Sequence, residues 1–148
     1  MSTSLKVATS AEEYDICGNI WLEASKTGHP FIPVTFWEEH LAEMKERYLP
    51  SSHVAMVEED GVPVGFVAIS EDNLAALFIL PSHWGRGIGG ELLNHAREGK
   101  RSLTLSVYAQ NASAIRFYKK HGFTSSRLQP CPHTGEPEIF MEWRAPKE

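Results

Sequence analysis

The spacing of apolar positions changes along the chain, and each spacing predicts one kind of element. Over the first fifty residues, apolar side chains recur every three or four positions, the period of a helix that packs one face on a core. The spacing therefore predicts two helices, the second ending at Pro50. Their inward faces would carry Tyr14, Cys17, Trp21, Ala24, Trp37, Leu41, Met44 and Tyr48.

Capping patterns place the start of both helices. Residues 10–13, Ser-Ala-Glu-Glu, fit a capping box, so the first helix should begin near Ala11 and run to about Ser25. Residues 35–38, Thr-Phe-Trp-Glu, offer a second capping box for the next helix. The glycine and prolines of residues 28–33 break the chain between the two.

From residue 53 onward, the pattern changes to short runs typical of strands. Residues 53–58 and 62–70 form the arms of a predicted hairpin, because Glu59-Asp60-Gly61 between them is a turn signal. Residues 74–80 are a nearly unbroken apolar run, which predicts a strand buried on both faces.

The second half of the chain alternates predicted helices with predicted strands. Helices are expected at 87–97 and 111–121, and strands at 103–108, 123–128 and 138–143. The whole order is two helices, three strands, helix, strand, helix and two strands. This order predicts the α/β (α+β) class, with a mixed sheet that carries helices on its faces.

Composition narrows the class of protein. The 148 residues are 42% hydrophobic and 22% charged, so we expect one domain spanning residues 1–148. The formal net charge of −5 is a poor basis for binding nucleic acid, which relies on clustered lysine and arginine. Cys17 and Cys131 are far apart and no CxxC pair occurs, so we expect neither a disulfide framework nor a metal site.

The chain also shows no targeting signal. Its first residues carry no apolar run fit for a signal peptide. The longest apolar stretch, residues 74–81, is far too short to cross a bilayer. We therefore expect a cytoplasmic protein, monomer or homodimer, with reduced thiols and no membrane partner.

The densest chemical signal is a turn at residues 81–90, Pro-Ser-His-Trp-Gly-Arg-Gly-Ile-Gly-Gly, between a predicted strand and a predicted helix. Glycines let the backbone approach a ligand closely, and the start of a helix adds a partial positive charge. A phosphate is the ligand that such a junction favours, with Arg86 supplying a full charge. The plainer interpretation is a loop that merely turns tightly.

Other nucleotide motifs fit this turn less well. Residues 85–90 satisfy the Gly-x-Gly-x-x-Gly spacing of a dinucleotide site, but they lie in mid-chain after a hairpin. No acidic residue ends the next strand, as that site requires. A P-loop would need a following Gly-Lys-Ser/Thr, which is absent from this sequence. The pattern therefore favours a pyrophosphate site of another architecture.

Two motifs together resemble the GNAT superfamily of N-acetyltransferases. The family's phosphate motif, Gln/Arg-x-x-Gly-x-Gly/Ala, is matched at both glycines by residues 84–89, with Trp84 at the first position. Its second signature, an asparagine followed by an aromatic pair and Gly-Phe, is reproduced by Asn111, by residues 117–118 and by residues 122–123.

The resemblance covers about residues 54–143. Residues 29–31, His-Pro-Phe, and 135–137, Gly-Glu-Pro, are similar to those of small, uncharacterised bacterial members. The resemblance implies a GNAT-like fold, with a mixed, mostly antiparallel central sheet flanked by about four helices. It also implies acetyl-CoA as the cosubstrate.

The resemblance implies a role for each matching residue. Residues 77–79 would pair their backbone with the pantetheine arm, and the glycine turn would hold the pyrophosphate. Asn111 would hydrogen-bond the pantetheine, although a plain helix N-cap is the alternative and both roles can hold together. The implied cofactor-binding residues are Leu77, Phe78, Ile79, Gly85, Arg86, Gly87, Ile88, Gly89, Gly90, Asn111, Ala114, Phe117 and Lys120.

The implied reaction is direct attack of a primary amine, of a small molecule or a peptide, on the thioester in a ternary complex. Tyr118 would lie by the sulfur and serve the leaving thiolate, the alternative being a core tyrosine. The group that deprotonates the amine stays open. His29 has a suitable intrinsic pKa, but a solvated loop histidine is an equal interpretation. Glu71, Asp72, Glu136 and water are the other candidates.

Two further functions compete with an enzyme. A non-catalytic acetyl-CoA-binding sensor would keep the glycine turn without needing Tyr118. A nucleotide-binding domain would use the same turn for ATP or NAD. The presence of both the turn and Tyr118 favours an enzyme.

Overall fold

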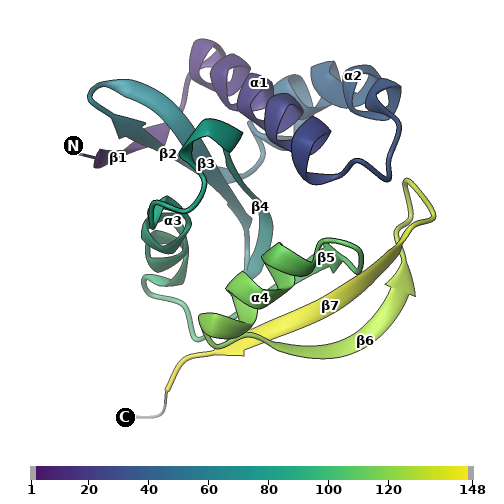
Figure 1. Ribbon diagram of the computed structural model, residues 1–148. Helices are drawn as coiled ribbons and strands as arrows, with labels where there is room; N and C mark the ends of the chain where they lie inside the picture. The colour runs from purple at the N-terminus through teal and green to yellow at the C-terminus, as the bar shows by residue number, and fades with distance from the viewer. Residues whose placement is uncertain (1–2, 147–148) are drawn as a thin grey trace. The chain divides into compact units, whose positions relative to one another are not determined.

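The computed structural model describes residues 3–146, which contain seven strands and four α-helices (Figure 1). The chain divides into two compact units, Met1–Ala96 and Arg97–Glu148. The predicted α/β (α+β) class, with mostly antiparallel strands and about four helices, is confirmed. The expectation of one domain over residues 1–148 stays a prediction.

In the first unit, four strands form an antiparallel sheet in the order β1-β2-β3-β4. Its elements are β1 (Thr3–Ala8), α1 (Ala11–Gly28), α2 (Val34–Glu43), a π-helical turn η1 (Met44–Tyr48), β2 (His53–Glu59), β3 (Val62–Ser70), β4 (Asn73–Ile79), a 3-10 turn η2 (Pro81–His83) and α3 (Ile88–Arg97). The last residue of α3 already belongs to the second unit.

The core of the first unit is centred on β2 and β3. Every residue of 54–57 and of 64–69 is buried, so both faces of these strands are covered. Helix α1 lies beside α2 (Figure 1). Between them, Trp21 meets Trp37 edge-to-face, with ring centroids 5.3 Å apart.

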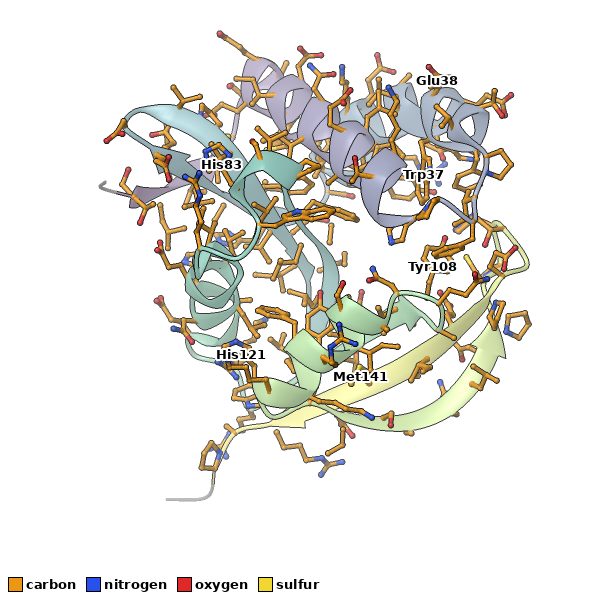
Figure 2. All side chains as sticks on the ribbon, viewed as in Figure 1. Trp37, Glu38, His83, Tyr108, His121 and Met141 are labelled. Atoms are coloured by element: carbon orange, nitrogen blue, oxygen red, sulfur yellow. The ribbon has the colours of Figure 1, made fainter. Side chains whose placement is uncertain are left out.

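In the second unit, three strands form an antiparallel sheet in the order β5-β7-β6. Its elements are β5 (Ser102–Tyr108), α4 (Ala112–Lys120), β6 (Thr124–Pro130) and β7 (Pro137–Arg144). Met141, on β7, is fully buried, and Figure 2 labels it on the central strand of the three.

The start of α1 confirms its predicted capping box. The Glu13 amide donates to Ser10 Oγ at 3.2 Å, and the Ser10 amide donates to Glu13 Oε1 at 3.1 Å. The helix continues past the predicted end at Ser25 as far as Gly28.

The second capping box is wrong. Helix α2 begins at Val34 with Pro33 as its N-cap, and no side chain caps it. Proline fixes a φ compatible with helix entry, so the helix starts one residue before Thr35. The predicted inward position of Tyr48 is also wrong. The π-helical turn that follows α2 leaves Tyr48 43% exposed.

Two strand predictions also need correction. Strand β4 is not buried on both faces: Leu74 and Ala76 are buried, but Ala75 between them is exposed and residues 77–79 are only partly covered. Strand β1 was not predicted, because it is an edge strand whose central residues, including Leu5 and Val7, are exposed. In the described part of the chain, every helix is too short or too polar to cross a membrane.

Candidate active site

The glycine-rich turn links β4 to α3 and has an open inner surface. Gly85 and Gly87 adopt φ angles of 78° and 80°, a left-handed conformation that favours glycine. A β-carbon placed on either would meet nothing within 4 Å. The backbone here can therefore approach a ligand as closely as the sequence motif predicts.

The N-terminus of α3 supplies the donors of this turn. The Glu91 amide donates to the Gly87 carbonyl at 3.3 Å, which starts the helical hydrogen-bond ladder. The amides of Ile88, Gly89 and Gly90 precede that first bond, as the unsatisfied first-turn donors of any helix do. Together with the positive end of the helix dipole, they suit an anion. The side chain of Ile88 is buried, so only its backbone is available to a ligand.

Glu59, at the end of β2, contacts two side chains of the turn. Arg86 Nη1 lies 3.3 Å from Glu59 Oε1, and His83 Nε2 lies 3.4 Å from the same oxygen. Figure 2 labels His83 at the η2 turn. Sequence reasoning named Arg86 as a phosphate ligand but missed this carboxylate, which lies 27 residues away in the chain.

The register of β4 decides which backbone groups a ligand can reach. The Leu80 amide donates to the Val64 carbonyl at 2.8 Å, so the backbone of Leu80 points toward β3. Antiparallel pairing alternates along the strand, so Phe78 also directs its backbone toward β3. Leu77 and Ile79 direct their amide and carbonyl groups away from β3.

Trp84 contacts one of these backbone groups. Its indole Nε1–H donates to the Ile79 carbonyl at 2.8 Å, while the residue remains 48% exposed. A β-carbon at Gly28 would lie 3.9 Å from Trp84 Cη2, so the indole rests against the end of α1.

His29 follows α1 directly and is buried in an aromatic cluster. Its ring stacks on Trp37 with centroids 5.3 Å apart, and meets Phe31 and Phe78 edge-on at 5.7 and 6.5 Å. Figure 2 shows Trp37 on α2. Burial lowers the pKa of His29 to about 4, so the ring is neutral at pH 7. The solvated-loop interpretation of His29 is therefore wrong, since the residue is only 8% exposed.

Asn111 is the N-cap of α4. Its Oδ1 accepts hydrogen bonds from the Ala114 amide and the Ser113 hydroxyl, both at 3.2 Å. The N-cap interpretation is confirmed, and it is compatible with a second role for the carboxamide.

Tyr118 lies on the same helix and is 9% exposed. Its ring packs edge-on against Phe117 and Phe123, with centroids 5.2 and 5.5 Å away. Burial raises the pKa of the Tyr118 phenol, which keeps the hydroxyl protonated and able to donate. Elsewhere on α4, Ala114 and Phe117 are partly covered and Lys120 is exposed.

Three carboxylates are candidates for the base that deprotonates the amine. Glu71 and Asp72 are exposed in the surface turn between β3 and β4. Glu136 precedes β7, where its Oε2 accepts from Gln110 Nε2 at 3.1 Å. None of these three carboxylates is buried, so each lies in contact with solvent.

The fold and the glycine turn together define a class: an α/β protein whose glycine-rich turn, where a strand passes into a helix, suits a phosphate-bearing ligand. A family model described as an acetyltransferase (GNAT) domain matches residues 50–125. The chain belongs to this GNAT family and is an acetyl-CoA-dependent N-acetyltransferase. The sensor and nucleotide-binding alternatives are thereby set aside.

Relatives of known name support this assignment along most of the chain. The peptidyl-lysine N-acetyltransferase YiaC of Escherichia coli K12 is 36% identical over 125 residues, covering 84% of this chain and 86% of YiaC. The peptidyl-lysine N-acetyltransferase YjaB of the same strain is 34% identical, covering 80% of each chain.

Solved structures share the fold. The solution structure of apo YjaB from Escherichia coli superposes with a TM-score of 0.83 at 28% identity, covering 97% of this chain and 98% of YjaB. The PaiA N-acetyltransferase of Thermoplasma acidophilum, crystallised with coenzyme A, gives a TM-score of 0.79 at 20% identity, covering 98% of this chain and all of PaiA.

Proposed function

We propose that this chain transfers the acetyl group of acetyl-CoA to the ε-amine of a lysine in a polypeptide. The observation that carries the acceptor is the similarity to YiaC and YjaB, both named as peptidyl-lysine N-acetyltransferases, over at least 80% of the chain. A small-molecule amine is the second candidate. It is favoured by 28% identity over 107 residues to an L-methionine sulfoximine/L-methionine sulfone acetyltransferase of Salmonella typhimurium.

The first unit offers a fitting site for the cosubstrate. The amides of Gly85–Gly90 would hold the pyrophosphate, because the surface facing Gly85 and Gly87 is open. Arg86 would add a charge after leaving Glu59. Leu77 and Ile79 would pair with the pantetheine amides, since their backbone groups face away from β3. Phe78 would contribute its side chain instead.

Helix α4 carries the other residues for which the family resemblance implies a role in holding the cosubstrate. We assign the Asn111 carboxamide to the pantetheine, Ala114 to the surface along which it lies, and Phe117 and Lys120 to the nucleotide end. Bound acetyl-CoA supplies an acyl group already activated as a thioester. The chain's own residues would bind the cosubstrate, orient the amine and donate a hydrogen bond to the leaving sulfur.

Tyr118 would serve the leaving thiolate as a hydrogen-bond donor. An ordinary phenol has a pKa of about 10 and a thiol about 8.5, so full proton transfer is uphill by about 2 kcal/mol. Burial raises the Tyr118 pKa and increases that cost. A donated hydrogen bond needs no full transfer, and it strengthens as negative charge develops on sulfur.

His29 would position the amine rather than deprotonate it. A lysine ammonium has an ordinary pKa of about 10.4. Moving its proton to an imidazole of pKa about 4 is uphill by roughly 9 kcal/mol at 1.36 kcal/mol per pKa unit. We therefore propose that the amine binds in its neutral form, having lost its proton to bulk solvent beforehand, and we assign to His29 a neutral aromatic wall shared with Phe31 and Trp37 beside Phe78.

An assay of thiol release tests the proposal. Purified protein, acetyl-CoA and a lysine-containing peptide with a blocked N-terminus should release coenzyme A and give a peptide heavier by one acetyl group. The matched control replaces the lysine with norleucine and should release none above background. If methionine sulfoximine supports thiol release and none of the lysine-containing peptides does, the proposed lysine acceptor is wrong and the small-molecule alternative is favoured.

A further inference from the structure

Trp84 occupies a backbone group that the proposed reaction needs for its cosubstrate. The indole N–H donates to the Ile79 carbonyl at 2.8 Å. That carbonyl faces away from β3, the side on which the pantetheine arm would pair with β4. The indole therefore lies where a pantetheine amide would donate to the same oxygen.

The two donors compete for space as well as for the oxygen. A carbonyl oxygen has two lone pairs and can accept two hydrogen bonds. The indole body, however, extends from Ile79 toward the end of α1, where it rests against Gly28. An extended arm cannot follow the strand past Ile79 while the indole stays in this position.

We propose that Trp84 is a gate over the cosubstrate strand, which acetyl-CoA displaces when its pantetheine arm pairs with Ile79. The inference rests on the proposed function, since it takes the cosubstrate to be acetyl-CoA. Trp84 stands at the position where the family motif carries Gln or Arg, so the gate is a property of this chain's own sequence.

The local structure lets the indole leave. Almost half of Trp84 is exposed, so the ring has an open side into which it can rotate. Its amide bonds to the Pro81 carbonyl at 3.2 Å, which anchors the main chain behind it. The next residue is Gly85, which has no side chain to hinder an adjustment of the turn and has open space beside it.

Calorimetric titration with acetyl-CoA tests the gate. Trp84→Phe keeps an aromatic ring but removes the N–H, so binding no longer has to break that bond. We expect this variant to bind acetyl-CoA about threefold or more tightly than the wild type, because one net hydrogen bond changes an affinity by about that factor or more. Trp143→Phe, a substitution on β7, is the control and should leave the affinity unchanged.

A shorter ligand localises the effect. Adenosine 3′,5′-diphosphate has the nucleotide end but no pantetheine, so the wild type and Trp84→Phe should bind it equally. Equal or weaker acetyl-CoA binding by Trp84→Phe would contradict the proposed gate and would mean that Trp84 only stabilises the turn. A gain shared by adenosine 3′,5′-diphosphate would overturn it too, because the effect would then come from the phosphate site.

A measurement on the wild type covers the case in which Trp84→Phe does not fold. The indole proton of Trp84 should exchange with water faster, by NMR, once acetyl-CoA saturates the protein. Unchanged exchange at saturation contradicts the gate while leaving the acetyltransferase intact. Absence of any acetyl-CoA binding by the wild type would instead overturn the proposed site itself, so the two failures are distinguishable.

Discussion

At the scale of single residues, burial keeps both proposed catalytic side chains neutral. It raises the pKa of the Tyr118 phenol and lowers that of the His29 imidazole to about 4. Both shifts have the same cause, because a low-dielectric environment disfavours the charged form of either group. A neutral phenol can donate to a thiolate, whereas a neutral imidazole of low pKa is a poor proton acceptor.

Substitution of Tyr118 by Phe tests its role at the sulfur. The change removes only the hydroxyl and preserves the ring contacts with Phe117 and Phe123. Turnover should fall about 10²-fold or more, as for other positioned acids. Acetyl-CoA affinity should change by less than about 1 kcal/mol, since the contact matters in the transition state. Less than a threefold loss of kcat in steady-state kinetics would make Tyr118 a core residue only.

The lowered pKa of His29 predicts how stability depends on pH. The unfolded chain protonates His29 near pH 6.5, whereas the folded protein does so only near pH 4. Between these values the unfolded state binds more protons, so stability falls as the pH falls from 6.5 to 4, by about 3 kcal/mol at most. Above pH 6.5 this contribution is constant.

The phenylalanine variant isolates that contribution. His29→Phe keeps a ring beside Trp37 but cannot titrate. Urea unfolding at several pH values should show a shallower loss of stability for His29→Phe than for the wild type between pH 6.5 and 4. Parallel curves for the two proteins would mean that His29 is not buried as described. For the same reason, we expect His29 to add no inflection to the pH–rate profile between pH 6 and 8.

At the scale of elements, the turn between β4 and α3 depends on its glycine conformation. Gly87→Ala adds a β-carbon to the surface that we assign to the pyrophosphate. It should lower acetyl-CoA affinity by tenfold or more in calorimetry, because the backbone can no longer approach the ligand.

Gly99→Ala is the matched control for the backbone strain. Gly99 has a φ of 70°, close to the 80° of Gly87, and the same open surroundings. Both substitutions should cost about 1 kcal/mol of stability through the left-handed backbone. Only Gly87→Ala should weaken binding. Equal affinity losses in the two variants would place the phosphates elsewhere.

Local sequence rules succeeded where the determining interactions are local. The capping box at Ser10 and Glu13 formed as predicted, because both partners belong to the same helical turn. The second box failed since Pro33, one residue before Val34, already fixes the helix start. Strand β1 was not predicted because it forms by pairing with β2, which lies about fifty residues further along the chain.

At the scale of the whole molecule, ligand binding should raise the thermal stability. A ligand at about 100 times its Kd stabilises the folded state by about 2.7 kcal/mol. For a chain of 148 residues, that corresponds to an increase in Tm of roughly 5 to 11 °C. Differential scanning fluorimetry should show this shift with acetyl-CoA and no shift with NAD or ATP. No shift with millimolar acetyl-CoA would contradict the proposed cosubstrate site.

The sequence by itself determined the family and located the motifs on which the proposed site rests. The glycines of residues 85–90 and the pattern from Asn111 to Phe123 are short motifs whose meaning lies in the residue types and their spacing. The conformation of such a turn, and the cap at the start of such a helix, follow from nearby residues alone. The turn conformation and the helix cap could therefore be predicted from the sequence alone.

Only the tertiary structure decided the state of the side chains. The neutrality of His29 depends on its burial among Phe31, two residues away, Trp37 on α2 and Phe78 on the distant strand β4. Other strands also decide two further features of the site. They place Glu59 beside Arg86, and they set which backbone groups of β4 point toward β3 and which point away from it. Burial, ion pairing and register are set by partners distant in sequence, and spacing along the chain does not encode them.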